Sequence, residues 1–262
     1  MSVITLTTDW GIKDYYIAIV KGKVMSFVPE ISIVDITHEI EAFNILKASF
    51  VIKNSYHHFP KGTIHIVGVD NQDPSKMAML LVELNGHYFL GSDNGIFSLI
   101  FDVPLERVFK INSFTGSSSF PVMECFVDVA CGLAYGRKSE DYGVLTNDWL
   151  KLMPFKPLIT NDEIKGNVIY IDNYGNVITN IKKDDFYKIK QDRNFRISFV
   201  RTSYDIVEIS NSYSDVLEAE RLALFNSSGY LEIALNKAKA NSLLGLKIND
   251  AIKVSFKEES LF

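Results

Sequence analysis

The sequence predicts an α/β domain in three layers, followed by an all-β domain in the form of a barrel. In the first half, short apolar runs typical of buried strands alternate with segments of helical periodicity, which is the pattern of a sheet covered by helices. Beyond Gly166, short strands at even spacing, separated by turn residues, favour a small barrel or sandwich. We therefore expect an α/β domain at 1–150, a linker at 151–164 and a β-barrel at 165–262.

Each element of the first half has its own signal. Val3–Leu6 is an apolar strand, and Asp14 can cap a helix whose apolar stripe reaches Phe27 and ends before Pro29. Asn85-Gly86 between two apolar runs is a strong hairpin signal. The expected strands are 3–6, 31–36, 63–69, 79–84 and 88–90, and the expected helices are 14–27, 44–56 and 125–135.

In the second half, turn residues separate the strands. Pro154, Pro157 and weak periodicity over 138–165 mark the break from the first half. The segments 173–175 and 227–229 read as turns. The expected strands are 167–171, 176–181, 195–200, 206–209, 222–225, 230–235 and 252–256, with one brief helix at 237–244.

Composition excludes several classes of protein. A chain of 262 residues that is 47% hydrophobic and 23% charged is neither disordered, coiled coil nor collagen-like. Its net charge of −5, without a basic run, argues against a nucleic-acid binder. No apolar stretch approaches the roughly 18 residues that a membrane span needs, and the N-terminus lacks the basic region of a signal peptide. We therefore expect a cytoplasmic protein with neither a nucleic-acid nor a membrane partner.

Metal and redox chemistry find no support in the motifs. Cys125 and Cys131 lie six positions apart, which fits neither a CxxC redox site nor a zinc cluster, so we expect two buried thiols. The sequence contains no Walker loop, GxGxxG, GxSxG or HExxH motif. We therefore expect neither a metal nor a cofactor.

Polar residues gather where the predicted strands end, at Asp9, 37–39, 70–73 and 92–95. In α/β sheets ligands bind beyond the carboxyl ends of the strands. A carboxylate at the position of Asp9 can accept both hydroxyls of a ribose, but it can equally cap a helix or turn. His38 is better explained as a core or turn histidine than as a catalytic group.

The motifs also carry a resemblance to a known family. The opening Thr7-Thr8-Asp9-Trp10-Gly11 is followed by similar segments at 35–40, 59–63, 91–95, 171–176, 226–234 and 244–246. In this order they resemble the S-adenosylmethionine hydroxide adenosyltransferases and the related chlorinase and fluorinase enzymes. The resemblance spans nearly the whole chain, so the chain is identified as a member of this family.

The resemblance implies a fold, an assembly and a reaction. Members have an N-terminal α/β domain and a C-terminal β-barrel, and they assemble as homotrimers. Their ligand lies between the N-terminal domain of one subunit and the C-terminal domain of its neighbour. Water, chloride or fluoride attacks the 5′ carbon of S-adenosylmethionine and expels methionine.

It also implies roles for individual residues. Asp9 would hold the ribose diol, and Phe43 occupies the place of an aromatic near the ribose. Tyr213 falls near the adenine, which backbone groups around Leu235 and Lys237 would otherwise bind.

For the methionine end, the resemblance implies that Asp172 and Asn176 bind the amino and carboxylate groups. Ser227 or Ser228 would help them.

The sequence departs from the family's pattern at the reacting centre. The family's hydrolases activate water with an Asp-Arg-His trio, of which Asp70 matches the aspartate. The arginine is absent, and only Lys76, with a one-residue shift, could supply its charge. Pro121 occupies the histidine position, and proline offers neither a base nor a donor. Val122 stands where the halogenases have small residues, so no halide site is expected.

Three readings follow from these departures. The first is an adenosine-forming S-adenosylmethionine hydrolase in which Asp70, Asp73 or Lys76 positions the water. The alternative is a catalytically impaired relative that binds S-adenosylmethionine or adenosine as a sensor or scaffold. A third is altered chemistry, with another nucleophile or another adenosyl compound.

Overall fold

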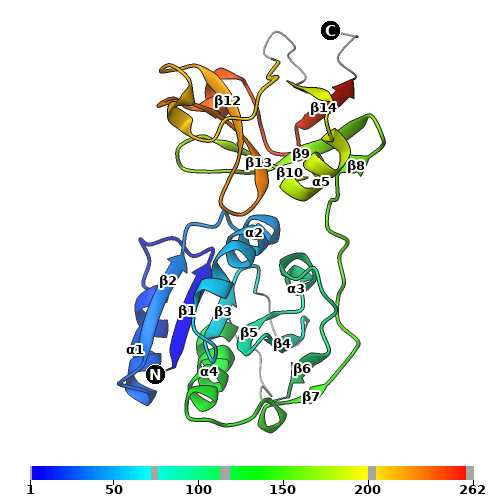
Figure 1. Ribbon diagram of the computed structural model, residues 1–262. Coiled ribbons are helices and arrows are strands. Elements are labelled where there is room, and N and C mark those ends of the chain that lie inside the picture. The colour runs from blue at the N-terminus through cyan, green and yellow to red at the C-terminus, as the bar shows by residue number, and fades with distance from the viewer. Residues whose placement is uncertain (1, 72–75, 113–118, 200–204, 258–262) are drawn as a thin grey trace. The chain divides into compact units, whose positions relative to one another are not determined.

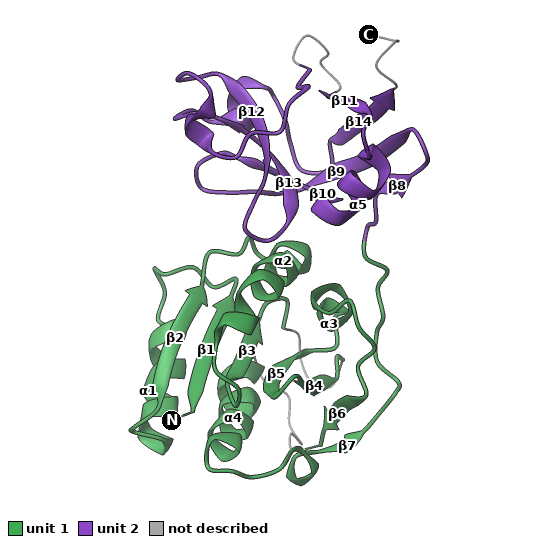
Figure 2. Cartoon of the chain, in the orientation of Figure 1, with its two compact units in different colours: residues 1–154 green, residues 155–262 purple. Residues whose placement is uncertain are grey.

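The computed structural model describes residues 2–71, 76–112, 119–199 and 205–257. The chain divides into two compact units, residues 1–154 and 155–262, whose elements are labelled in Figure 1 and which Figure 2 shows in green and purple. The boundary falls inside the segment expected as a linker, although a short strand, β8, also lies in that segment.

The first unit is built on a seven-stranded mixed sheet in the order β2-β1-β3-β5-β4-β6-β7 (Figure 1). The pairs β1–β2, β1–β3 and β3–β5 are parallel, whereas β4, β6 and β7 pair antiparallel. The carboxyl ends of β1 and β3 therefore lie side by side. The strands are β1 (Val3–Thr8), β2 (Ser32–Thr37), β3 (Ile64–Gly68), β4 (Met79–Leu84), β5 (His87–Ser92), β6 (Arg107–Ile111) and β7 (Gly143–Leu145).

Helices cover both faces of this sheet. Because side chains alternate along a strand, β4 sends Met79 and Leu81 into a core with the first helix pair and Leu80 and Val82 into a core with the second. The first pair is α1 (Tyr16–Phe27) and α4 (Val127–Ala134), and the second is α2 (Ile45–Ser55) and α3 (Ile96–Ile100). The predicted α/β sheet with its helices is confirmed.

Two local predictions in this unit have different outcomes. The hairpin is confirmed, since Asn85 and Gly86 have φ of 53° and 82°, the left-handed values that a tight two-residue turn between twisted strands requires. The cap at Asp14 is wrong, because α1 begins at Tyr16 and its capping position is Tyr15, without a side-chain hydrogen bond.

The helix that ends the α/β pattern begins earlier than expected. A π-helical turn, Val122–Phe126, follows Pro121 and continues directly into α4. Such turns are rare and often occur at functional sites. Cys125 and Cys131 are buried, as expected, and burial raises the pKa of the Cys131 thiol to about 11.

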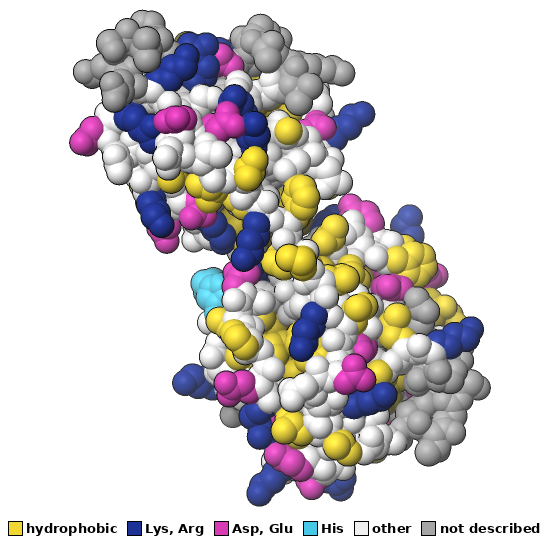
Figure 3. All heavy atoms as spheres, turned by 90° about the vertical axis from the view of Figure 1, so that its right-hand side faces the viewer, with side chains coloured by type: hydrophobic (Ala, Val, Ile, Leu, Met, Phe, Trp, Pro, Cys, Tyr) yellow, Lys and Arg dark blue, Asp and Glu magenta, His cyan; other side chains and the backbone are white. Residues whose placement is uncertain are grey.

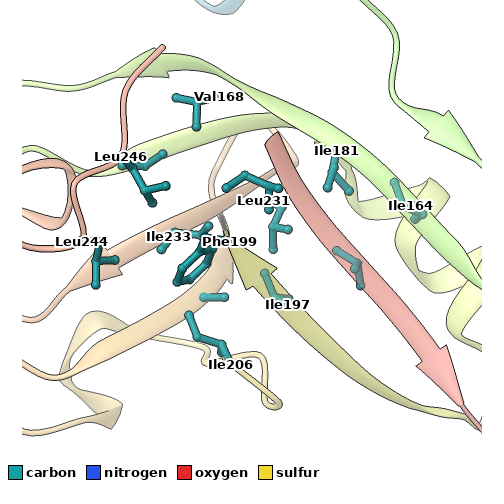
Figure 4. Packing of buried hydrophobic residues seen from close by; sticks show 14 of the residues in the cluster. Ile164, Val168, Ile181, Ile197, Phe199, Ile206, Leu231, Ile233, Leu244 and Leu246 are labelled. Atoms are coloured by element: carbon teal, nitrogen blue, oxygen red, sulfur yellow. The ribbon is translucent and has the colours of Figure 1, made fainter. Parts of the chain in front are cut away.

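The second unit is a curled antiparallel sheet in the order β11-β14-β9-β10-β13-β12, with β8 paired to β9. Its buried side chains gather in one core, among them Ile181 of β10 and Leu231 and Ile233 of the neighbouring β13 (Figure 4). The strands are β8 (Leu158–Ile159), β9 (Glu163–Ile171), β10 (Val177–Lys182), β11 (Asn194–Phe199), β12 (Arg221–Phe225), β13 (Tyr230–Leu235) and β14 (Ala251–Lys257). The helices are α5 (Lys183–Lys190), which the sequence did not indicate, and α6 (Ala240–Leu243).

The closed barrel stays a prediction. Over residues 155–199 and 205–257, no ladder joins β11 to β12. The strand expected at 206–209 is reduced to an isolated bridge between Ile206 and Ile197, while the Ser210 amide donates to the Ala223 carbonyl of β12. The apolar run at Ile206 is therefore used to fill the core rather than to extend the sheet.

On the face that Figure 3 shows, Lys and Arg side chains are interspersed with Asp and Glu. Within the described ranges, no helix has both the length and the apolar character needed to cross a bilayer.

Candidate functional site

A cavity of about 220 Å³ lies in the first unit, beyond the carboxyl ends of β1 and β3. This is the edge at which parallel strands of an α/β sheet usually present ligands. The lining residues come from the loops after β1, β2 and β3 and from the start of the π-helical turn. They are Asp9, Trp10, Tyr16, Phe43, Asp70, Asn71, Ser119, Phe120, Pro121 and Val122.

Asp9 anchors two backbone segments of the cavity. Its Oδ2 accepts hydrogen bonds from the Phe43 amide at 2.9 Å and from the Asp70 amide at 3.2 Å. Both donors have left-handed backbones, with φ of 67° and 49°, which non-glycine residues seldom adopt outside sites that hold them in place. Among the described residues Oδ1 receives no hydrogen bond, so one oxygen shapes the loops and the other keeps its acceptor capacity.

Polar residues at the end of β5 and just after it hold the backbone that carries Asp70. The side-chain amide of Asn94 donates to the carbonyls of Val69 and Asp70, at 3.1 and 3.3 Å. Ser92 donates to the Asn71 side chain at 3.0 Å. In the part of the chain that the structure describes, the Asp70 carboxylate accepts no hydrogen bond. Its backbone is therefore held in place, while its carboxylate at the cavity keeps the capacity to bind water.

Aromatic rings form another part of the lining. Phe120 lies edge-on to Trp10 and Tyr16, with centroids 4.9 and 5.2 Å apart. The Trp10 ring fits against β3 only because residue 68 is glycine, since a Cβ there would lie 2.6 Å from Trp10 Cζ2. The described lining holds three of these rings, the Asp9 and Asp70 carboxylates, and no Lys, Arg or His. Carboxylates and ring faces together favour a cationic ligand with apolar parts.

The structure brings together the predicted residues Asp9, Phe43 and Asp70, with Pro121 and Val122 beside them. Val122 is fully buried, while the Phe43 side chain is 73% exposed.

Lys76 lies in an exposed turn before β4 and is not among the lining residues, so its catalytic role stays a prediction. Asp73 falls outside the described residues.

Sequence reasoning did not single out Tyr16, Asn71, Ser119 and Phe120 as lining residues. Trp10 belongs to the motif at 7–11, which could have indicated its place in the lining. Ser119 and Phe120 come from a distant part of the chain, and their one signal is that they directly precede Pro121, which the resemblance puts at the reacting centre.

His38 is a structural histidine, as expected. It is buried, and its Nδ1 lies 2.7 Å from the Thr8 hydroxyl. Its Nε2 is 3.2 Å from Asp35 Oδ1, an ion-pair distance without hydrogen-bond alignment.

In the second unit, Asp172 and Asn176 are hydrogen-bonded to each other. Asp172 Oδ1 accepts from the Asn176 amide at 2.8 Å, and Oδ2 accepts from its side chain at 2.9 Å. These bonds close the turn between β9 and β10, in which Gly175 has a left-handed φ of 83°. Asp172 and Asn176, predicted as a ligand-binding pair, therefore hold a turn together through the Asp172 carboxylate.

Tyr213 and the turn at 226–229 are both hydrogen-bonded to Glu232, a residue that the sequence analysis did not single out. The Tyr213 hydroxyl donates to Glu232 Oε1 at 2.6 Å, and Asn226 Nδ2 donates to Oε2 at 3.2 Å. Asn226 Oδ1 accepts in turn from the Ser228 amide, while the Ser227 side chain is exposed. Burial, hydrogen bonding to Glu232 and the nearby Asp172 charge raise the pKa of Tyr213.

These features define a class of protein: a mixed α/β unit with an acidic, aromatic cavity at its strand ends, joined to an antiparallel β unit that holds the buried carboxylate of Glu232. The family models of the SAM hydroxide adenosyltransferase N-terminal and C-terminal domains match residues 4–143 and 166–253. The chain belongs to the SAM hydroxide adenosyltransferase family.

Individual proteins are similar over nearly the full length. A (R)-S-adenosyl-L-methionine hydrolase of Methanocaldococcus jannaschii is 28% identical over 277 residues, covering 98% of this chain and 97% of its own. A fluorinase of Nocardia brasiliensis is 23% identical, covering 96% of each chain. The crystal structure of an uncharacterized conserved protein from Thermotoga maritima superposes with a TM-score of 0.88 at 29% identity, covering 97% of this chain and all of that one.

Proposed function

We propose that the protein hydrolyses S-adenosylmethionine to adenosine and methionine, by in-line attack of water on the 5′ carbon. The observation that carries this proposal is the cavity that combines the Asp9 and Asp70 carboxylates with the rings of Trp10, Tyr16 and Phe120. Membership of the family and the names of the relatives support the same substrate.

The chemistry asks little of the protein beyond positioning. The sulfonium is a good leaving group, and its positive charge disappears as the carbon–sulfur bond breaks. An apolar surrounding therefore favours the transition state over the charged ground state. Water must be held in line, about 3 Å from the carbon, and hydrogen bonding to a carboxylate raises its electron density. Asp70, with its backbone held by Asn94, is the residue we assign to this task.

The binding roles extend the resemblance to both units. Asp9 would bind the ribose diol through Oδ1, with Phe43 beside the ribose. Asp172 and Asn176 would hold the methionine amino and carboxylate groups with Ser227 or Ser228, and Tyr213 would lie at the adenine. We further propose that the second unit closes as a barrel and that the chain forms a homotrimer with the ligand between subunits.

We place the protein in the cytoplasm and assign it a small adenosyl ligand, without a cofactor, a nucleic-acid partner or a membrane partner. The acidic net charge of −5 supports the exclusion of nucleic acid.

One observation favours a second candidate, a relative that binds the ligand without turning it over. Pro121 lines the cavity at the place of the family's histidine, and Lys76 does not line it. Asp70 then has no described catalytic partner in the cavity. Such a protein would act as a sensor or scaffold for S-adenosylmethionine or adenosine.

The deciding experiment is incubation with S-adenosylmethionine, supplied as each epimer at sulfur because the names of relatives specify the (R) form. Chromatography then measures adenosine and methionine against a blank without protein. Adenosine in equal amount to methionine, lost in Asp70→Ala but kept in the surface variant Asp102→Ala, would establish the hydrolase. S-adenosylmethionine retained without product would support the binding relative, and neither turnover nor binding would refute both.

A further inference from the structure

Glu232 is an acidic residue in the middle of β13, a strand whose residues are all buried. Its neighbours Leu231 and Ile233 enter the main core of the second unit. Glu232 is on the opposite face, the side of β13 on which Ala234 packs with Leu224 in a smaller apolar cluster. Only 3% of Glu232 is exposed. A carboxylate buried to this degree is costly unless its oxygens are hydrogen-bonded.

Both oxygens are bonded, and each bond leads to a segment assigned to the ligand. Oε1 holds the Tyr213 hydroxyl at 2.6 Å. Oε2 holds Asn226, whose Oδ1 accepts from the amides of Ser228 and Tyr230, both at 3.1 Å. One side chain therefore joins the Tyr213 loop to the turn at 226–229.

The arrangement fixes the direction of one of these bonds. Because Asn226 Oδ1 already accepts from two backbone amides, its Nδ2 must face Glu232 as a donor. Glu232 Oε2 must then be an acceptor, and a proton on it would oppose that donor. A proton taken up by Glu232 would therefore sit on Oε1, where the Tyr213 hydroxyl now donates, and it would remove that bond. Both bonds in their present directions need an ionised Glu232.

We propose that Glu232 is a positioning residue which, as a carboxylate, holds Tyr213 and the 226–229 turn in their ligand-binding geometry. The inference rests on the proposed function, which assigns the adenine to Tyr213 and the methionine end to the serine turn. Glu232 itself is buried behind these segments and acts through them.

The proposal gives ligand binding an acid limit. Burial is the largest effect on the pKa of Glu232 and raises it, and the Asp172 charge adds to this, while the bonds from Tyr213 and Asn226 oppose it. The net pKa is above the usual value of about 4.3 for a glutamate. As the pH falls through this raised pKa, Glu232 gains a proton on Oε1, the bond donated by the Tyr213 hydroxyl is lost and the affinity for the ligand drops.

The test compares KM and kcat for S-adenosylmethionine in Glu232→Gln, Tyr213→Phe and Glu163→Gln, each checked for folding by thermal unfolding. Glu163→Gln is the matched control, since it removes a carboxylate paired with Lys165 and Lys253 at the far end of β9. We expect Glu232→Gln to raise KM about tenfold and to keep kcat within a factor of three. The rise in KM at low pH that we expect for the wild type should be absent in this variant. Tyr213→Phe should raise KM similarly, and the double variant should be no worse than either.

The results separate a failure of this inference from a failure of the proposed function. An active wild type with an unchanged KM in Glu232→Gln, or with the same acid-side profile in both, would overturn the inference alone. If Glu232→Gln does not fold, an unchanged KM in the exposed-loop variant Tyr213→Phe would overturn it in the same way. A wild type that neither turns over nor binds S-adenosylmethionine would overturn the proposed function and this inference with it.

Discussion

The carboxylate of Asp9 accepts a hydrogen bond from the backbone amide of Asp70, 61 positions later in the chain, at 3.2 Å. The same oxygen holds the Phe43 amide at 2.9 Å. The side chain assigned to the ribose therefore also fixes the backbone of the residue assigned to the water. Changes at Asp9 must affect binding and local structure together.

Asp9→Ala should remove most of the affinity for adenosine, because the substitution deletes the ribose acceptor and leaves two amides without their partner. The lost hydrogen bonds should lower the free energy of unfolding by about 1–3 kcal/mol. Isothermal calorimetry and urea unfolding measure the two effects. Asp9→Asn can keep an acceptor for both amides and should retain most of the stability. An unchanged affinity in Asp9→Ala would remove Asp9 from the site.

Gly68→Ala should displace the Trp10 ring from the cavity, since the new Cβ would lie 2.6 Å from Cζ2. We expect a loss of about 1–3 kcal/mol of stability from overpacking and a shift in tryptophan emission, to which two residues contribute. Gly22→Ala is the control, because nothing lies within 4 Å of its added Cβ in α1. That variant should gain about 0.5–1 kcal/mol from helix propensity. Equal spectra for Gly68→Ala and wild type would contradict the placement of Trp10.

Lys76→Arg combined with Pro121→His should raise hydrolysis, because an imidazole at a position lining the cavity can serve as a base. General acid–base groups contribute roughly 10²- to 10⁴-fold, so a gain of at least about tenfold in adenosine formation is a fair threshold. The single variant Pro121→His separates the base from the added guanidinium. Folded variants without any gain would show that the cavity has diverged beyond these groups.

Stability should fall as the pH is lowered, because His65 and His87 are buried neutral. His65 Nδ1 lies 2.7 Å from the Thr5 hydroxyl, and its Nε2 lies 3.2 Å from His87 Nδ1. Burial, then the neighbouring His87, lowers the pKa of His65 to about 3, and burial and the Lys61 charge lower that of His87.

Since the folded pKa lies below the unfolded value of about 6.5, the unfolded chain binds more protons below pH 6.5. The stability contributed by His65 is therefore present above that pH and declines down to about pH 3, by up to about 1.4 kcal/mol per pH unit. Urea unfolding between pH 7.5 and 5 should show a shallower slope for His65→Gln than for wild type. Ser26→Ala, at an exposed position and without a change of titratable groups, should keep the wild-type slope. Parallel slopes for all three proteins would refute this role.

The chain should assemble as a trimer, with a mass about three times 29.6 kDa. The proposed function requires this, because the ligand would contact the first unit of one subunit and the second unit of the next. Light scattering after size-exclusion chromatography measures the mass. A monomer that nevertheless turns over S-adenosylmethionine would show that the site does not need two subunits.

The part of the cavity at the strand ends could be predicted from the sequence. Asp9 and Asp70 each follow an apolar strand, and parallel neighbours bring their carboxyl ends to one edge. The hairpin at Asn85-Gly86 was equally predictable, because few residues adopt two left-handed conformations in succession.

The rest of the cavity lining, the surroundings of Glu232 and the fate of segment 206–209 depend on tertiary contacts that no local pattern encodes. Phe120 joins the cavity through rings of Trp10 and Tyr16, more than a hundred positions away. Glu232 looks like the polar residue of an ordinary alternating strand until Tyr213 and Asn226 cover it. The segment 206–209 is apolar, as a strand would be, but Ile206 packs in the core and the segment does not form a strand.

The burial of the two cysteines has a consequence for a protein that handles a sulfonium. S-adenosylmethionine is an alkylating agent, and a thiolate beside it would compete with water for the electrophilic carbon. Cys125 and Cys131 are instead buried in the core between α4 and the sheet, and with its pKa near 11 the Cys131 sulfur stays protonated and weakly nucleophilic at neutral pH. In the proposed hydrolase, the burial of these soft nucleophiles would disfavour alkylation of the chain by its own substrate.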